Sequence, residues 1–264
     1  MATPSEEWRL SDYSGFFELF DSARRIVVLT GAGVSTLSGI PDFRSSKGLY
    51  SSKFDHMSVE EILDIDFFNR HPDIFYNWAK GNWYILEEHE PNIIHRTLRR
   101  MEDVGKLSEG IFTQNIDNLH QKAGSKKVYE LHGSLAKGYC PNCHSYHSYN
   151  EISRAVNSDR LPICSQCGNV IKPDIVFYGE GLDVTTLKRA EFAFQNADLA
   201  LVLGSSLVVN PAASLPFIAA RSKKHIVIVN RDRTYIDEYA DYRFENLEEF
   251  FINLSGHIES VFKR

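Results

Sequence analysis

The stretch IVVLTGAGVST, residues 26–36, joins a short apolar run to a glycine-rich turn. Residues 26–29 are rich in β-branched side chains, which is typical of a buried strand in a parallel sheet. Gly31 and Gly33 follow where such a strand would end. Glycines at that position let backbone N–H groups at the start of a helix approach a diphosphate. The stretch therefore predicts an α/β fold that binds a dinucleotide.

The same stretch departs from the fingerprint of dehydrogenases. That fingerprint has a third glycine where this chain has Thr36, and an acidic residue after a second strand about 20 residues further on. The residues around position 55 instead read KFDHMSVEE, which predicts a loop leading into a helix. The pattern is compatible with a bound dinucleotide and does not support the usual arrangement for hydride transfer.

Strands and helices alternate along the rest of the chain. Apolar runs predict further buried strands at residues 110–113, 128–131, 199–203 and 226–229, and helical spacing of apolar residues predicts helices at 93–107 and 184–196. Several strands end in polar clusters: QNID (114–117), HGS (132–134), GSS (204–206) and NR (230–231). Because the carboxyl ends of parallel strands share one edge of a sheet, these clusters predict one converging ligand site.

Two segments, 45–90 and 136–172, interrupt this alternation, and the second contains all four cysteines. They form two C-x-x-C pairs separated by a polar loop: Cys140, Cys143, Cys164 and Cys167. This spacing is typical of a Cys₄ zinc site, whereas redox-active pairs or a chance pattern are the alternatives. Four thiolates fill a tetrahedral coordination sphere without His144 or His147. The sequence therefore predicts a structural Zn²⁺ and places the chemistry elsewhere.

Composition limits the classes of function. The chain has 264 residues, enough for a large domain and a smaller one, and its 43% hydrophobic content is that of a globular protein. A net charge of −6 offers no general attraction to nucleic acid or to an anionic membrane. No apolar run approaches the roughly 18 residues that span a bilayer. The first residues, MATPSEEWRL, lack the features of a secretory signal. We therefore expect a cytoplasmic protein without nucleic-acid or membrane partners.

Seven motifs occur in an order that resembles the sirtuins, the NAD-dependent protein-lysine deacylases, and in particular their compact bacterial type. They are GAGVSTLSGIPDFR (31–44), TQNIDNLH (113–120), LHGS around His132, the two C-x-x-C pairs, IVFYGE (175–180), GSSLVV (204–209) and VNRD (229–232). The resemblance implies a Rossmann-type parallel sheet flanked by helices, formed by residues 1–44, 91–135 and 173–264. It also implies a small inserted domain, with a helical module at 45–90 and a zinc ribbon at 136–172.

The resemblance also implies the residues that hold NAD. A glycine-rich cradle and a serine loop would contact the phosphates, a mobile loop would cover the reactive ribose, and a strand end would contact the nicotinamide ribose and carboxamide. A last strand end would contact the adenosine ribose. The cradle would be Gly31, Ala32 and Gly33, and the serine loop Gly204, Ser205 and Ser206. The mobile loop would contain Asp42, Phe43 and Arg44, and the nicotinamide side Gln114, Asn115, Ile116 and Asp117. Asn230 and Arg231 would lie at the adenosine ribose.

For catalysis, the resemblance makes His132 the general base for the ribose hydroxyls and Asn115 the residue that orients the ribose and its attacking partner. The acyl group would pass to ADP-ribose with release of nicotinamide. Ser205 and Ser206 also have a structural interpretation, because their hydroxyls could cap the following helix. His95, within the helix predicted at 93–107, is interpreted as structural.

The acylated peptide would lie extended between two loops and add a strand to them. The residues implied are Gly179, Glu180 and Gly181 on one side, Leu207, Val208 and Val209 on the other, with Val176 and Phe177 lining the acyl-lysine tunnel. Sirtuins that remove succinyl or malonyl groups carry a Tyr and an Arg three residues apart. Tyr76 is followed at that distance by Ala79, with Lys80 next to it. The sequence therefore favours a neutral acyl group.

Two other functions are compatible with parts of the pattern. An ADP-ribosyltransferase or NAD hydrolase on the same fold would share the attack at the nicotinamide ribose. A zinc-ribbon protein that binds nucleic acid would share the cysteine pairs, but it would not need the polar strand ends around Asn115 and His132.

Overall fold

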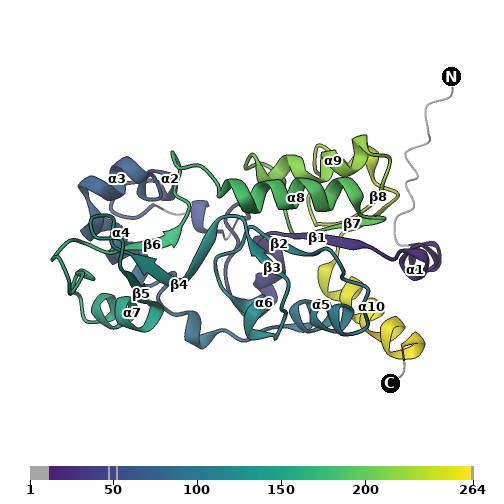
Figure 1. Ribbon diagram of the computed structural model, residues 1–264, viewed down its shortest axis with the longest axis horizontal. Helices are drawn as coiled ribbons and strands as arrows, with labels where there is room; N and C mark the ends of the chain where they lie inside the picture. Colours follow the sequence, from purple (N-terminus) through teal and green to yellow (C-terminus); the bar gives the residue numbers. More distant parts are fainter. Residues whose placement is uncertain (1–11, 47, 52, 263–264) are drawn as a thin grey trace.

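The computed structural model of the chain describes residues 12–46, 48–51 and 53–262. The N-terminal stretch 1–10, for which no secretory signal is predicted, lies outside the described residues, as do the outer ends of the predicted large domain. The described chain forms two lobes side by side along its long axis, each built around its own sheet (Figure 1).

The larger lobe contains a six-stranded parallel sheet, which confirms the predicted Rossmann-type fold. The strand order is β3-β2-β1-β7-β8-β9, so the direction of winding reverses between β1 and β7. The five predicted strands are present, each within one residue at either end, and β9 was not predicted. The strands are β1 (Ile26–Thr30), β2 (Gly110–Thr113), β3 (Val128–Glu130), β7 (Leu199–Leu203), β8 (His225–Val229) and β9 (Tyr242–Phe244).

Helices cover both faces of this sheet. On one face lie α8 (Val184–Asn196) and α9 (Leu215–Arg221); on the other lie α5 (Ile93–Asp103), α6 (Leu119–Lys122) and α10 (Leu247–Val261), with α1 (Tyr13–Ser22) at the end of the lobe (Figure 1). The helix predicted at 93–107 ends earlier, because Gly105 adopts a left-handed backbone conformation with φ +77°. Each face has its own apolar core cluster.

The smaller lobe combines short helices with an antiparallel sheet of order β5-β4-β6. Its elements are α2 (Val59–Ile62), α3 (Ile65–Arg70), α4 (Pro72–Lys80), β4 (Gly133–Tyr139), β5 (Tyr146–Ser148), α7 (Tyr149–Asn157) and β6 (Lys172–Ile175). The helix expected after KFDHMSVEE begins there, with Ser58 and Glu61 forming a capping box. The predicted domains meet at positions 135/136 and 172/173, which lie within β4 and β6. Since each of these strands continues across a predicted boundary, the boundaries of the two domains stay predictions.

One-turn 3₁₀ helices complete the description: η2 (Leu49–Ser51), η3 (Leu86–Glu88), η4 (Ala212–Ser214) and η5 (Asp237–Tyr239), with a longer one, η1 (Ala32–Ser38), directly after β1. Among the residues that the structure describes, no helix is both long and apolar enough to cross a membrane.

Candidate active site

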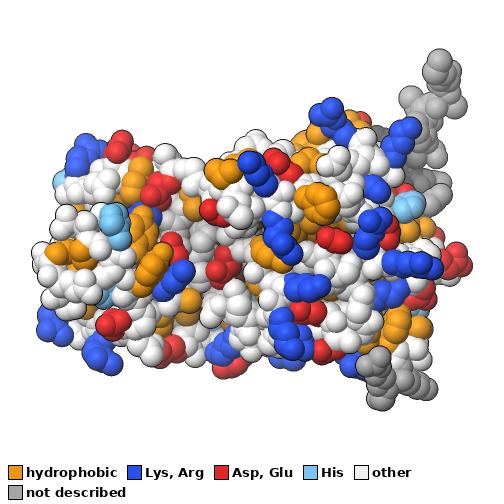
Figure 2. All heavy atoms as spheres, viewed as in Figure 1, with side chains coloured by type: hydrophobic (Ala, Val, Ile, Leu, Met, Phe, Trp, Pro, Cys, Tyr) orange, Lys and Arg blue, Asp and Glu red, His pale blue; other side chains and the backbone are white. Residues whose placement is uncertain are grey.

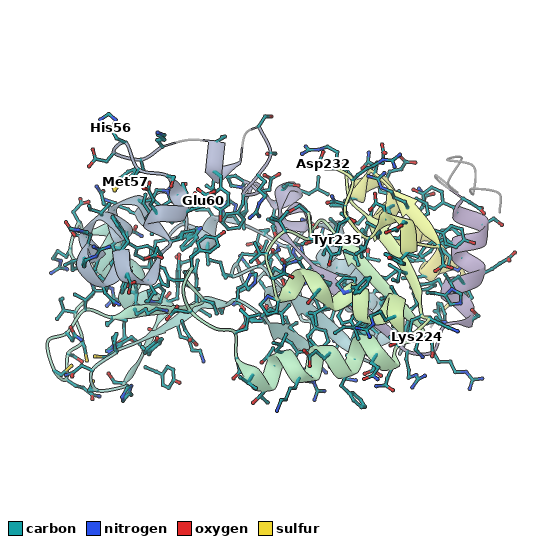
Figure 3. The ribbon with its side chains drawn as sticks, turned by 90° about the horizontal axis from the view of Figure 1, so that it is seen from above. His56, Met57, Glu60, Lys224, Asp232 and Tyr235 are labelled. Atoms are coloured by element: carbon teal, nitrogen blue, oxygen red, sulfur yellow. The ribbon has the colours of Figure 1, made fainter. Side chains whose placement is uncertain are left out.

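A cavity of about 990 Å³ opens where the winding of the large sheet reverses and extends toward the small lobe. This is the place at which open α/β sheets bind their ligands. Asp232, which lines it from the loop after β8, is labelled on the large lobe in Figure 3, and Glu60 of α2 is labelled on the small lobe.

Most of the predicted site residues line this one cavity. They are Gly31, Ala32, Gly33, Asp42, Phe43, Arg44, Gln114, Asn115, Ile116, His132, Val176, Phe177, Gly179, Glu180, Gly204, Ser205, Ser206, Val209, Asn230 and Arg231. Three others lie outside the lining, and one of them, Leu207, is buried in the core. Asp117 is buried one layer behind Asn115, and Val208 points outward with 60% of its surface exposed.

The loops after β1 and β7 interlock through their glycines. The N–H groups of Gly31 and Gly33 donate to the carbonyls of Leu203 and Gly204, at 3.0 and 2.9 Å. A Cβ atom on Gly31 would lie 2.7 Å from the Gly204 oxygen, and Gly204 itself has a left-handed φ of +59°. Glycine is therefore required for the two backbones to approach this closely. Because these N–H groups are already engaged, the glycines shape the floor of the cavity.

The strand end after β2 carries a layered set of polar side chains. The Asn115 side-chain amide donates to the Ser35 hydroxyl at 3.1 Å and to the Gly31 carbonyl at 3.2 Å. The Ser35 hydroxyl in turn donates to the Asp117 carboxylate at 2.6 Å. Burial raises the pKa of Asp117, and the hydrogen bonds from Ser35 and from the Leu119 N–H oppose that shift. Asp117 thus fixes the orientation of Asn115 through Ser35. The sequence pattern did not identify Ser35 as part of the site.

A second buried chain of hydrogen bonds supports the same strand end. The Thr30 hydroxyl donates to that of Thr113 at 2.8 Å, and Thr113 accepts the Asn115 N–H at 3.0 Å. His120 Nε2 lies 3.0 Å from the Thr30 oxygen. Since the Thr30 proton is engaged with Thr113, His120 is the donor in that contact. The nearby His95 lies on α5, where its Nδ1 accepts the Asn92 N–H in a capping box.

His132 follows β3 and faces the cavity in a defined protonation state. Its Nδ1 lies 3.1 Å from the Gln114 carbonyl oxygen. A carbonyl only accepts, so Nδ1 carries the proton and Nε2 has the free lone pair. That buried Nε2 has no hydrogen-bond partner among the described residues. Burial also lowers the pKa of the imidazole, against an opposing contribution from Gln114. His132 is therefore a neutral base with its acceptor nitrogen available.

The predicted substrate loop after β6 is held by a buried ion pair. Lys172, whose side chain is 4% exposed, lies 3.0 Å from the Glu180 carboxylate and also donates to the Ile175 carbonyl at 2.7 Å. The same carboxylate accepts the Phe177 N–H at 2.9 Å. The side chain of Glu180 is thus occupied in shaping its own loop.

Among the described residues, Tyr76 and the residues three and four positions after it form no carboxylate-binding pair near the tunnel predicted at Phe177. The Tyr76 hydroxyl donates to the Ile171 carbonyl at 2.5 Å, and Ala79 is fully buried. Lys80 instead pairs with Asp159 at 2.7 Å. The Lys and Arg residues among the described cavity lining are Arg44 and Arg231.

Beyond position 232 the structure adds residues that the sequence pattern did not identify. Glu245 and Leu247, between β9 and the start of α10, line the cavity beside Asn230. The buried Arg243 of β9 contacts Glu245 at 2.7 Å and donates to the Asn230 carbonyl at 3.1 Å. The strand that carries Arg243 and precedes Glu245 has only three residues, which is too short for a recognisable pattern.

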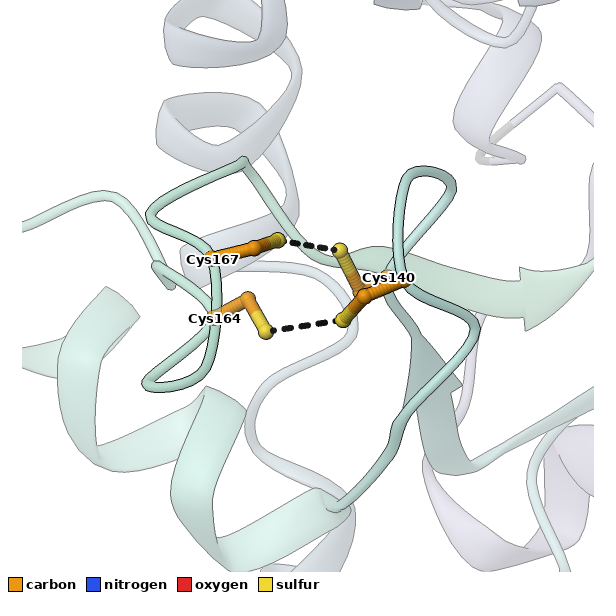
Figure 4. A group of neighbouring side chains, drawn as sticks. Cys140, Cys164 and Cys167 are labelled. Carbon is orange, nitrogen blue, oxygen red and sulfur yellow. Dashed lines mark hydrogen bonds between the residues drawn. The ribbon is translucent and has the colours of Figure 1, made fainter.

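The four cysteines form one cluster in the small lobe, and Figure 4 draws this group of side chains. Their sulfur atoms lie within 4.8 Å of one another, with Cys140–Cys167 at 3.3 Å and Cys143–Cys164 at 3.5 Å. A tetrahedral zinc with Zn–S bonds of about 2.3 Å requires sulfur atoms about 3.8 Å apart, so the donor set and spacing fit Zn²⁺.

The two halves of the cluster have matching backbones. His144 N–H donates to the Cys140 carbonyl, and Gly168 N–H donates to the Cys164 carbonyl, each at 2.9 Å. His144 and Gly168 both adopt left-handed conformations, with φ of +59° and +75°. The cluster therefore consists of two equivalent turns that face each other.

A Rossmann-type sheet, a cavity at its switch point and an inserted four-cysteine module define the class: a dinucleotide-binding α/β protein whose small lobe contains a possible zinc site. The model of the Sir2 family matches residues 31–211. The chain is also 44% identical over 229 residues to an NAD-dependent protein deacetylase of Thermotoga maritima, covering 87% of this chain and 91% of that one. This chain therefore belongs to the Sir2 family, as its motifs predicted.

Solved structures agree with this assignment. Sir2Tm bound to a propionylated peptide superposes with a TM-score of 0.83 at 39% identity, covering 94% of this chain and 98% of that chain. A Sir2 complex with a p53 peptide and NAD⁺ superposes with a TM-score of 0.82 at 40% identity, covering 93% of this chain and 96% of that chain.

Proposed function

We propose that this chain is an NAD-dependent protein-lysine deacetylase, which transfers the acyl group to ADP-ribose and releases nicotinamide. The observation that carries the proposal is the lone pair of His132 Nε2, held inside a nucleotide-sized cavity with Asn115 in the same lining. Relatives at this level of identity are NAD-dependent protein deacetylases. Bound NAD would supply an electrophilic ribose carbon and the hydroxyl that receives the acyl group.

The residues of the chain divide the work. His132 takes a proton from a ribose hydroxyl through Nε2, while Gln114 retains the proton on Nδ1. Asn115, oriented through Ser35 by Asp117, positions the ribose and the attacking acyl oxygen. Phe43, on the loop over the cavity, shields the reacting carbon from water.

The remaining cofactor roles follow the lining of the cavity. Gly31, Ala32 and Gly33 would form the diphosphate cradle with Gly204, Ser205 and Ser206. Asn230 and Arg231 would contact the adenosine ribose, with Glu245 beside them. Asp42 and Arg44 would complete the mobile loop. The four cysteines would hold a structural Zn²⁺ that stabilises the small lobe.

The acyl-lysine peptide would lie between residues 179–181 and 207–209, with the acyl-lysine entering beside Val176 and Phe177. Structures of relatives contain propionylated and acetylated peptides. A neutral acyl group fits this chain, because Lys80 pairs with Asp159 and the basic residues of the described lining belong to the cofactor side.

We also propose that the enzyme acts in the cytoplasm on proteins, without nucleic-acid or membrane partners. Four reduced cysteines that hold a metal are suited to a reducing compartment. On the face shown in Figure 2, basic and acidic side chains are interspersed, and the net charge of −6 offers no general attraction to nucleic acid or an anionic membrane.

Incubation with NAD and an acetyl-lysine peptide tests the function. One nicotinamide released per acetyl group removed is expected. Nicotinamide release without deacetylation would make the chain an NAD hydrolase, or an ADP-ribosyltransferase if a protein became modified. On one peptide sequence, kcat/KM for acetyl-lysine should exceed that for succinyl-lysine by at least about tenfold, since an unpaired carboxylate is costly to bury. A succinyl preference would overturn the neutral-acyl proposal.

A further inference from the structure

Tyr50 and Tyr178 belong to segments that serve different ligands, and their side chains meet in the cavity. Their hydroxyl oxygens are 2.7 Å apart, although the residues are 128 positions apart in the sequence. Tyr50 lies in η2, just after the proposed cofactor loop. Tyr178 lies between Phe177 and Gly179 in the proposed substrate loop. Both side chains line the cavity.

Tyr50 is attached closely to the cofactor loop. Its backbone N–H donates to the Phe43 carbonyl at 2.9 Å, and its ring centroid lies 5.3 Å from that of Phe43. The Arg44 guanidinium lies over the same ring, 5.2 Å from its centroid. A movement of Phe43 and Arg44 over the nucleotide would therefore carry Tyr50 with it.

Tyr178 is attached equally closely to the substrate side. Its N–H donates to the Leu63 carbonyl at 2.9 Å, and its carbonyl accepts the Ile65 N–H at 3.0 Å. Leu63 follows α2, whose Glu60 is labelled in Figure 3. The neighbouring Phe177 is fixed by the Glu180 carboxylate. The Tyr178 hydroxyl is thus presented from a braced loop.

We propose that the Tyr50–Tyr178 hydrogen bond is a latch that couples binding of the dinucleotide to binding of the acyl-peptide. The inference rests on the proposed function of the two loops. Each ligand holds one loop in place, and the bond forms only when both loops are in place. Binding of either ligand therefore favours binding of the other by the same factor.

The latch is a neutral hydrogen bond. Burial, together with the Tyr178 hydroxyl, raises the pKa of Tyr50 well above its usual range, so the phenol stays protonated. A neutral hydrogen bond of ordinary net strength corresponds to a factor of about two to ten in an equilibrium constant. This is the expected size of the contribution to coupling.

The test removes one oxygen and keeps the ring. Titration calorimetry measures the Kd of carba-NAD, an unreactive analogue, with and without saturating acetyl-lysine peptide; the ratio of the two values is the coupling factor. Tyr178→Phe should lower this factor about two- to tenfold, Tyr50→Phe should lower it equally, and the double variant should show no further loss. Tyr146→Phe is the matched control, because Tyr146 lies on β5 outside the cavity lining with 71% of its surface exposed.

Three outcomes would overturn the latch. The coupling factor could be unchanged in Tyr178→Phe. The peptide affinity alone could fall at constant coupling, which would make the hydroxyl a direct substrate contact. Both single-ligand affinities and the thermal midpoint could fall together, which would indicate general destabilisation. Deacetylation by the wild-type protein is measured first, so that a failure of the proposed function is recognised separately.

Discussion

The two sheets of this protein are stabilised in different ways. In the large lobe, β1 and β7 are buried at every position and pack between two apolar clusters. In the small lobe, β5 is buried at only its middle residue and β4 at three of seven. A cluster rich in aromatic side chains forms the core of this lobe, and Cys140 and Cys164 of the four-cysteine group belong to it. The large lobe depends on apolar burial, whereas the small lobe also contains a cysteine group that could hold a metal ion.

The proposed active site lies where these two regions meet. His132 follows β3 of the large sheet and directly precedes β4 of the small one, and its carbonyl accepts the Val176 N–H at 2.9 Å. A flexible small lobe would therefore disturb the position of the base even if the large lobe remained folded. Changes at the junction, in the small lobe and in the large lobe should have separable consequences.

The largest expected effect comes from the junction itself. His132→Ala should lower the rate of deacetylation by about 10²- to 10⁴-fold, the usual cost of removing a positioned base. NAD affinity by calorimetry should change little, because the glycine cradle is untouched. Nicotinamide exchange should fall less than deacetylation, since the base acts after nicotinamide leaves.

His225→Ala provides the control for this variant. His225 is the first residue of β8, so it lies at the amino ends of the parallel strands, whereas the cavity lies at their carboxyl ends. Near wild-type deacetylation by His132→Ala would remove the base from the mechanism.

The second-largest effect should come from loss of the metal, which should destabilise the small lobe more than the large lobe. Cys164→Ser should lower both bound zinc and stability; a loss of about 3 kcal/mol would lower the thermal midpoint by about 6–12 °C. Hydrogen exchange should show lost protection in β4 and β6 with β1 and β7 still protected. Ser165→Ala, at the adjacent exposed position, is the control. Complete zinc loss at unchanged stability would contradict a structural role.

Acid should affect the large lobe through a buried histidine. Burial lowers the pKa of His95 to about 4 from an ordinary 6.5. The unfolded chain therefore takes up this proton first as the pH falls, and the folded state loses stability progressively between about pH 6.5 and 4, by up to about 3 kcal/mol. Denaturant unfolding at several pH values measures this slope. His95→Gln, which cannot titrate, should show a shallower slope than the wild type, and an equal slope would refute the assignment.

The smallest effects should come from the two cysteine turns. Gly168→Ala should cost about 1 kcal/mol, because an L-residue is strained at its φ of +75° although no atom lies within 4 Å of the added Cβ. His144→Gly should gain up to about 0.5 kcal/mol, because relief of the same strain is partly offset by greater freedom of the unfolded chain. Thermal unfolding of zinc-loaded protein measures both, and effects of the same sign would show that the turns are not equivalent.

Sequence alone determined the features that depend on near neighbours in the chain. Residues 26–29 and 199–203 are continuous apolar runs, so burial on both faces follows from their composition. The cysteine spacing likewise specifies two turns. In contrast, β9 was beyond such reasoning, because a strand of three residues leaves no period to read.

Only the tertiary structure decided which distant side chains complete the site. It placed Ser35 between Asn115 and Asp117, paired Lys80 with Asp159, and brought Tyr50 to Tyr178. The physical reason is that hydrogen bonds and ion pairs act over a few ångströms, while their partners here lie tens of residues apart or more. Whether such groups meet depends on how the lobes pack, and local composition and spacing carry no record of that packing.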